Sequence, residues 1–175
     1  SISATTVYSQ SWTVLEDSAR HYREKKNAEK SVQFYQLAKE KLPADSTVSL
    51  TSIRLNQSAG DTWRTASQFK KAYPFLLEVR RLTGLLSGDA TAPYATADDN
   101  IGIVLYFNGD YDEAIPFLQE SLRIREKIFG AESAEYAQSC NLLGALYIRL
   151  SSFNEAEQFH YRAKTIRERI AKEKK

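Results

Sequence analysis

Apolar residues recur at helical spacing along nearly the whole chain. In the segment 95–107, Ile101, Val104 and Leu105 lie three and four positions apart or adjacent, and Leu118 and Leu122 continue the pattern in the next segment. This spacing gathers apolar side chains on one face of an α-helix. Only 7 glycines and 4 prolines interrupt the 175 residues, which favours long helices over a β protein with many turns. The pattern predicts an all-α protein.

The helices are expected in pairs joined by short turns. Gly109 follows one apolar segment, and glycine readily adopts the left-handed conformation on which helices often end. Asp110 comes next, with Glu113 three residues later. That arrangement predicts a capping box, in which the two side chains satisfy backbone donors at the start of the second helix.

The helix pair repeats at an offset of 42 residues. Segment 109–117 matches 151–159, segment 111–118 matches 69–76, and the small residue Gly102 matches Gly144. Small residues at these places predict close contacts between helices, where a larger side chain would overpack. A more divergent first unit, at 27–38, precedes the second by about 41 residues. We expect one array over 1–175 with a flexible N-terminus at 1–8 and repeats at approximately 12–43, 53–88, 95–130 and 137–172.

The pattern resembles the tetratricopeptide repeat, in the 42-residue form found in kinesin light chains and related bacterial proteins. The resemblance is carried by 100–106, 109–114 and 121–130, and again by 143–147, 153–156 and 163–168. It implies an all-α fold, a right-handed α-α superhelix of about four helix pairs. In such a solenoid the first helices line a groove for an extended or helical peptide. The resemblance implies no catalytic activity.

One face of each first helix is expected to line this groove. Asn100 and Asn141 are the main candidates, because an amide can pair with both donors and acceptors of a peptide main chain, a role that the resemblance also gives to asparagine near these places. The full set of expected groove residues is Arg54, Gln57, Asp61, Asp99, Asn100, Ile103, Phe107, Gln138, Asn141, Leu142 and Arg149.

Different chemistry is expected of the other groove residues. Ile103, Phe107 and Leu142 would form an apolar pocket for one anchoring side chain, or would pack against a further helix or another subunit. Arginines at 54 and 149 would hold a carboxylate through paired hydrogen bonds. Family members that bind chaperone C-termini use a clamp of Asn, Lys and Arg. Gln138 and Leu142 stand where Lys and Arg would be needed, which argues against that ligand.

Charge and hydropathy narrow the range of partners. The chain has 24 Lys and Arg against 22 Asp and Glu, a formal net charge of +2, and the signs alternate along the helices. Nucleic-acid binding normally requires a basic stripe, so we expect no nucleic acid partner. No apolar run reaches the ~18 residues of a membrane-spanning helix, so we expect no membrane insertion.

The sequence offers little for catalysis or for metal binding. The two histidines, His21 and His160, have no second ligand at helical spacing, and His160 aligns with Leu118, which indicates a packed side chain. Cys140 is expected to be a small buried hydrophobe. No phosphate-binding loop or nucleophile motif is present. We therefore expect no enzyme, no cofactor and no metal.

Taken together, these features favour a non-catalytic adaptor or scaffold whose partner is a protein or peptide. One alternative is a self-association module forming homo-oligomers, because Leu142, Leu146, Ile148 and Leu150 near the last helix would be covered on one side only. Another is the peptide-sensing or regulatory domain of a larger protein. A lone cysteine favours a reducing, cytoplasmic location, although a signal peptide removed before Ser1 is compatible with the sequence.

Overall fold

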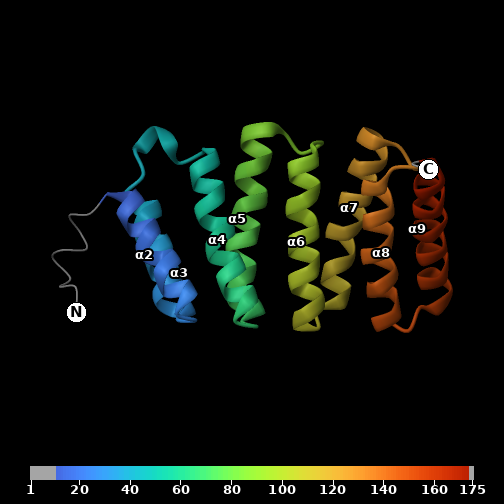
Figure 1. Cartoon of the computed structure of the whole chain (residues 1–175), viewed down its shortest axis with the longest axis horizontal. Coiled ribbons are helices and arrows are strands. Elements are labelled where there is room, and N and C mark those ends of the chain that lie inside the picture. The colour runs from blue at the N-terminus through green and yellow to red at the C-terminus, as the bar shows by residue number, and fades with distance from the viewer. Residues whose placement is uncertain (1–10, 174–175) are drawn as a thin grey trace. The chain divides into compact units, whose positions relative to one another are not determined.

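The structure, a computed structural model, describes residues 11–173, and within them eight α-helices and one short 3-10 helix follow one another without a strand. Figure 1 traces them from blue to red. They are α2 (Trp12–Glu24), α3 (Ala28–Glu40), η1 (Ala44–Ser46), α4 (Leu50–Thr65), α5 (Phe69–Ser87), α6 (Ala92–Asn108), α7 (Tyr111–Phe129), α8 (Ala134–Arg149) and α9 (Phe153–Glu173). The N-terminus expected to be flexible, 1–8, lies outside the described residues.

Three of the first helices, α4, α6 and α8, begin three residues earlier than the repeat pattern predicts. Helix α4 starts at Leu50 and α8 at Ala134, because a serine caps each one. The hydroxyl groups of Ser49 and Ser133 each accept the backbone N–H three residues later, at 3.1 Å. Such a cap satisfies a backbone donor that the first helical turn leaves unpaired.

The four turns inside the helix pairs share one backbone geometry. Lys26, Ser67, Gly109 and Ser151 all have positive φ, at 57°, 56°, 93° and 59°. In each turn this residue donates its N–H to the carbonyl three residues back, and the following N–H reaches the carbonyl five residues back. This is the Schellman motif that ends many helices. The sequence predicted it at Gly109 alone, because the other three positions lack glycine.

The capping box predicted for the third pair is wrong. The side chain of Asp110 accepts a hydrogen bond from the Asn108 amide instead of capping α7. The turn itself explains the difference, because it brings the two side chains together on either side of Gly109. In the first pair Asn27 does cap α3, by accepting from the backbone N–H of Lys30 at 3.1 Å.

Contacts between residues divide the chain into two compact units, Ser1–Leu86 and Ser87–Lys175. In unit 1, α2 packs on α3 and α3 on α4; in unit 2, α6 packs on α7, α7 on α8 and α8 on α9. The largest fully buried side chains include Tyr35 and Leu55 in unit 1 and Ile101 and Leu143 in unit 2. The two units are described separately below, and a single array over 1–175 stays a prediction.

The close contacts expected at small residues are confirmed. A Cβ atom on Gly60, Gly102 or Gly144 would lie 3.0 Å from Leu76 Cδ2, 2.4 Å from Leu118 Cδ2 or 2.8 Å from His160 Cε1 respectively. Each of these glycines is in the first helix of a pair, and each contact is in the second helix of the same pair. The 42-residue repeat therefore preserves one packing contact.

Candidate functional site

The predicted groove residues of unit 1 are held by one another and by neighbouring side chains. Arg54 of α4 is paired with the carboxylate of Glu16 on α2, which is itself only 4% exposed. The Gln57 amide donates to Asp61 Oδ2 at 3.1 Å. Arg64 donates hydrogen bonds to Asp61 Oδ1 from Nε at 3.2 Å and from Nη2 at 2.9 Å. These polar side chains form two sets of contacts, and a ligand at either set would have to displace existing pairs.

Asp99 corrects the predicted groove of unit 2. Asp99 is 3% exposed, and its Oδ2 forms an ion pair with Arg125 Nη2 at 2.7 Å. Arg125 also donates to the Ser139 hydroxyl at 2.9 Å, which links α6, α7 and α8. Burial raises the pKa of Asp99, and hydrogen bonds from Ser121 and Arg125 oppose that rise. Asp99 is therefore part of the packing between helices and does not face a groove.

The two asparagines expected to bind a peptide main chain lie in different surroundings. Asn100 is half-buried on α6. With its amide oxygen turned toward Arg167, Asn141 accepts two hydrogen bonds from that guanidinium, at 2.6 and 2.5 Å. The other end of the amide lies 3.4 Å from Nδ1 of His160. The Asn141 amide is thus hydrogen-bonded to side chains of α9, and we do not include it among the residues that contact a peptide.

Arg149 is held over two tyrosine rings. Its Nε donates to the Tyr111 hydroxyl at 2.9 Å. Its guanidinium carbon lies 5.4 Å from the Tyr111 ring centre and 6.0 Å from that of Tyr106, both within cation–π range. The hydrogen bond to Tyr111 raises the pKa of Arg149. The remaining expected residue, Gln138, is exposed on α8.

Three of the predicted apolar residues do lie together. Ile103, Phe107 and Leu142 line a cavity of about 210 Å³ between α6, α7 and α8, with Gly102, Tyr106, Leu118 and Ala145 completing its wall. Phe107 remains 60% exposed, whereas Leu118, which also lines the cavity, is 2% exposed. We call this the unit 2 groove. It is an apolar surface with a large exposed aromatic side chain at its edge.

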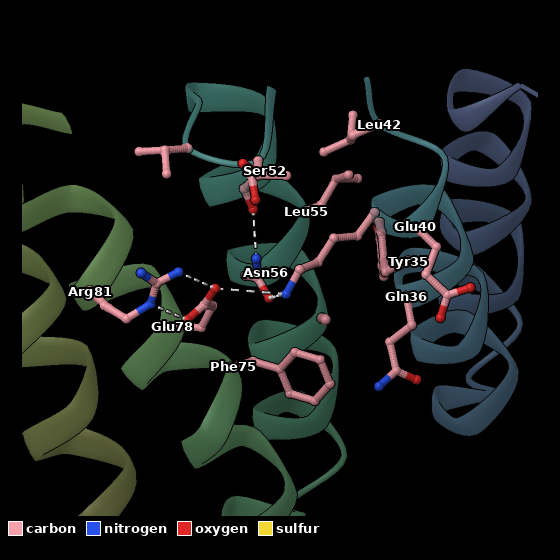
Figure 2. A pocket seen from close by; sticks show the side chains of 14 residues that line it. Tyr35, Gln36, Glu40, Leu42, Ser52, Leu55, Asn56, Phe75, Glu78 and Arg81 are labelled. Atoms are coloured by element: carbon pink, nitrogen blue, oxygen red, sulfur yellow. Dashed lines mark hydrogen bonds and ion pairs between the residues drawn. The ribbon is translucent and has the colours of Figure 1, made fainter. Parts of the chain in front are cut away.

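A second and larger cavity, of about 570 Å³, was not expected from the sequence. It opens in unit 1 between α3, α4, α5 and the segment that joins α3 to α4, and Figure 2 shows its lining side chains. Apolar groups such as Tyr35, Leu55 and Phe75 form part of the wall, and Lys39, Glu40, Glu78 and Arg81 contribute charges. We call this the unit 1 pocket.

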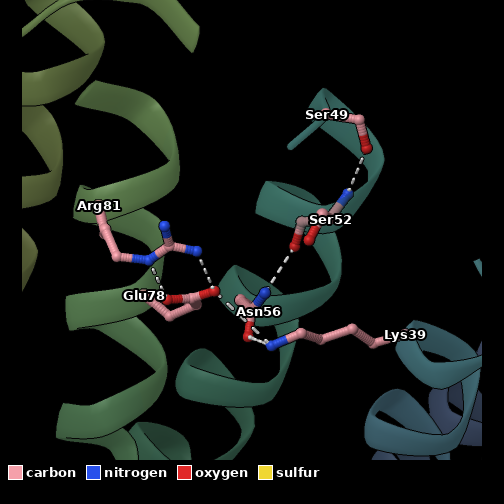
Figure 3. Close-up of polar contacts among 6 residues, drawn as sticks. All are labelled: Lys39, Ser49, Ser52, Asn56, Glu78 and Arg81. Atoms are coloured by element: carbon pink, nitrogen blue, oxygen red, sulfur yellow. Dashed lines mark hydrogen bonds and ion pairs between the residues drawn. The ribbon is translucent and has the colours of Figure 1, made fainter. Parts of the chain in front are cut away.

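A chain of polar contacts crosses the unit 1 pocket, as Figure 3 shows. Arg81 donates to both oxygens of Glu78, at 2.7 and 2.9 Å. Lys39 Nζ lies 3.9 Å from the same carboxylate and donates to Asn56 Oδ1 at 3.3 Å. The Asn56 amide donates in turn to the Ser52 carbonyl at 2.8 Å. The hydrogen bond from Arg81 is the main reason that the pKa of Glu78 is lowered.

The remaining chemistry-bearing side chains are packed. His160 lies against Gly144, as the repeat alignment predicted. Cys140 is fully buried with Ala137, Ala163 and Ile166, and burial raises the pKa of its thiol to about 11. In the described part of the chain, no three His, Cys, Asp or Glu side chains gather into a group able to hold a metal ion. Among helices α2 to α9, none combines the length and apolar character that a membrane crossing needs.

Comparison with known proteins finds a family model for part of the chain and similar solved structures for most of it. Residues 93–169, from α6 into α9, match the family model described as Tetratricopeptide repeat. No curated protein matches the chain. Among solved structures, BtubC (BKLC) from P. vanneervenii is 24% identical with a TM-score of 0.77, over 91% of this chain and 64% of its own.

Two further structures are similar at lower identity. The nearly identical TPR-like repeats of a putative kinesin light chain from Podosopora anserina are 14% identical with a TM-score of 0.77, over 97% of this chain and 79% of theirs. The apo form of RapI is 15% identical with a TM-score of 0.72, over 89% of this chain and 42% of its own. The family model matches 93–169, which is less than half of the chain, and the solved structures share an all-helical solenoid fold with nearly the whole of it, so this chain has that fold.

Proposed function

We propose that this chain is a non-catalytic protein-interaction module that holds an extended or helical peptide segment in the unit 2 groove. The supporting observation is the cluster of Ile103, Phe107 and Leu142 around a cavity of about 210 Å³, with Phe107 60% exposed. An exposed aromatic residue beside an apolar cavity is suited to contact one buried anchoring side chain, the usual source of most binding energy at an interface.

Arg149 suggests that the bound peptide carries an acidic group. Its guanidinium stacks over Tyr106, whose ring also lines the groove. Only Nε is engaged by Tyr111 in the contact described above, so the terminal nitrogens can donate to an anionic group at the end of the groove. The proposed ligand is therefore a peptide with an apolar anchor and an acidic residue beside it.

Peptide selection tests the proposed groove. Random 12-residue peptides displayed on phage would be selected on the purified chain, and the selected peptides would be titrated by fluorescence anisotropy. Phe107→Ala is expected to weaken binding tenfold or more, about 1.4 kcal/mol. Phe153→Ala is the matched control, because Phe153 is 64% exposed on α9 and lies outside the groove lining. Equal affinity of the Phe107 variant and the wild type would refute the groove assignment.

Self-association is the second candidate function. The sequence suggested it because four apolar residues near the last helix would be covered on one side only. That expectation is partly wrong, because Leu146 is fully buried. Ile148 is 47% exposed, and Tyr161 on α9 is 70% exposed. Exposed positions of α9 are otherwise largely polar, as is usual for a terminal repeat. Sedimentation at increasing concentration separates the two functions: a monomer at all concentrations would exclude self-association.

A cytoplasmic location belongs to the same proposal. Cys140 is a free and buried thiol, which fits a reducing compartment. Fractionation of cells that express the full gene product would test it, and recovery in a secreted or periplasmic fraction would contradict it.

A further inference from the structure

The unit 1 pocket uses a different face of α4 from the groove that the sequence predicted. Asn56 and Ala59 line the pocket, whereas Arg54, Gln57 and Asp61 were expected to line the groove. Positions two residues apart differ by about 200° around a helix with 3.6 residues per turn. The pocket residues of α4 therefore point to nearly the opposite side, and the pocket is a separate feature from any groove formed by the first helices.

The charges at the pocket leave one positive group incompletely satisfied. Both oxygens of Glu78 accept hydrogen bonds from Arg81, at 2.7 and 2.9 Å. Lys39 is farther away, with Nζ 3.9 Å from Glu78 and 3.3 Å from Asn56 Oδ1. Charge-assisted hydrogen bonds normally measure about 2.7–2.9 Å. Two cations thus share one carboxylate, and the ammonium group of Lys39 makes only long contacts.

A fourth charged side chain does not offset this excess. Glu40 also lines the pocket, but in the view of Figure 2 its carboxylate lies on the other side of Tyr35 from Glu78. The group of Lys39, Glu78 and Arg81 therefore carries a net charge of +1. A cationic ligand is disfavoured there, because the Glu78 carboxylate already accepts from Arg81 on both oxygens. An anionic ligand could accept a hydrogen bond from the Lys39 ammonium group.

Beside these charges the pocket has apolar side chains in its wall, some of them part of the buried core. Tyr35 and Leu55 are 2% and 1% exposed, and Phe75 is half-buried at the pocket. Asn56, which holds Lys39 in place, is 3% exposed and is fixed by its hydrogen bond to the Ser52 carbonyl. A volume of about 570 Å³ falls in the range of about 300–1,000 Å³ that is typical of ligand pockets.

We propose that the unit 1 pocket binds an apolar group that carries a carboxylate. Lys39, beside Arg81, receives the carboxylate, and the apolar part lies against Leu42, Val48 and Phe75, the apolar lining side chains that are accessible. The ligand is either the C-terminal residue of a peptide or a free organic acid, since both present this chemistry. This inference does not depend on the proposed unit 2 groove, because the two sites share no residue.

Three defined probes test the pocket by NMR on the full ¹⁵N-labelled chain. They are acetyl-Gly-Gly-Phe with a free carboxylate, the same peptide amidated at its C-terminus, and 3-phenylpropionate. The free-acid peptide is expected to shift amide resonances of α3, α4 and α5 and to leave those of unit 2 unchanged. The amidated peptide is expected to bind at least tenfold more weakly, because it lacks the anionic group that Lys39 would hold.

Charge-removal variants locate the carboxylate. Lys39→Met is expected to weaken binding of the free-acid peptide at least tenfold, and Arg81→Gln to weaken it also. Lys70→Met is the matched control, because Lys70 is an exposed lysine of α5 outside the pocket. Circular dichroism would verify that each variant is folded. A peptide bound at least tenfold more tightly than 3-phenylpropionate would assign the site to a C-terminus, and equal binding would assign it to an organic acid.

Three results would overturn the proposal. The first is the absence of resonance shifts with all the probes. The second is equal affinity for the acid and amide peptides. The third is unchanged affinity in the Lys39 variant. Failure here would leave the unit 2 groove untouched, because that groove is tested by a different variant, Phe107→Ala, and by peptides selected without regard to the C-terminus.

Discussion

Replacement of Gly102 by alanine offers a quantitative test of the packing in unit 2. The added Cβ would lie 2.4 Å from Leu118 Cδ2 and 2.6 Å from Leu118 Cγ. Favourable contacts between carbon atoms measure about 3.5–4.0 Å, so the leucine must move by about 1 Å. Rotation of the terminal methyl groups does not suffice, because Cγ is also too close. Leu118 is 2% exposed and has little room to move.

Two opposing effects determine the sign of this change. Alanine gains about 1 kcal/mol over glycine in a helix interior, whereas overpacking of a core costs about 1–3 kcal/mol. We expect Gly102→Ala to lower the free energy of unfolding, by up to about 2 kcal/mol. In a Leu118→Ala background the clash is absent and only the helix preference remains. There the same substitution is expected to raise stability by about 1 kcal/mol.

A double-mutant cycle isolates the clash. The helix preference occurs in both legs and cancels, so the coupling energy equals the overpacking cost of about 1–3 kcal/mol. Urea unfolding followed by circular dichroism at 222 nm would give the four free energies. Gly60→Ala is the milder comparison, because its Cβ would lie 3.0 Å from Leu76 Cδ2 and 3.2 Å from Leu76 Cγ, a smaller overlap than at Gly102. A coupling energy near zero would refute the close approach of α6 and α7 at this point.

Two further predictions concern charged groups. Arg125→Ala should lower the free energy of unfolding by about 3–5 kcal/mol, because it leaves the buried Asp99 without its ion pair; the exposed pair of Arg123 with Glu120 is the control, and a similar loss in Arg123→Ala would contradict the reasoning. The lowered pKa of Glu78 means that its contribution to stability is present above the unfolded value of 4.5 and is lost as the pH falls through the folded pKa. Glu78→Gln should remove that part of the acid loss, and identical pH profiles of urea midpoint for variant and wild type would disprove it.

The helices and their contacts could be predicted because their signals are local and periodic. Gly102 and Gly144 are 42 residues apart, and a helix repeats its faces regularly enough that the same offset places both against a second helix. The Schellman turns were predictable only at Gly109. At Lys26 and Ser67 nothing in the residue type indicates a positive φ, which the tertiary packing of the helix pair has to impose.

Some residues of the candidate sites could likewise be predicted from the sequence, and others could not. Ile103, Phe107 and Leu142 were predicted and do lie together, because helical spacing and the repeat offset fix their relative positions. Asp99 shares that spacing, but its burial depends on Arg125, which the helical pattern of α6 does not reveal.

The unit 1 pocket was missed for a related reason. Lys39, Asn56 and Glu78 come from three helices and are separated by 17 and 22 residues, which match neither the helical period nor the 42-residue repeat. Only the folded arrangement of α3, α4 and α5 brings them to one place. Sequence periodicity identifies faces of helices, but it does not identify which side chains meet across them.

The division of the chain into two units has an optical consequence. Both tryptophans, Trp12 and Trp63, are in unit 1, and the aromatic side chains of unit 2 are tyrosine and phenylalanine. Excitation at long ultraviolet wavelengths therefore reports on unit 1 alone. Trp63 is 8% exposed and has the Lys71 ammonium 4.5 Å from its ring centre, so its emission should change when this surrounding is lost. The unlabelled chain thus carries a reporter that distinguishes events in its first half from those in its second.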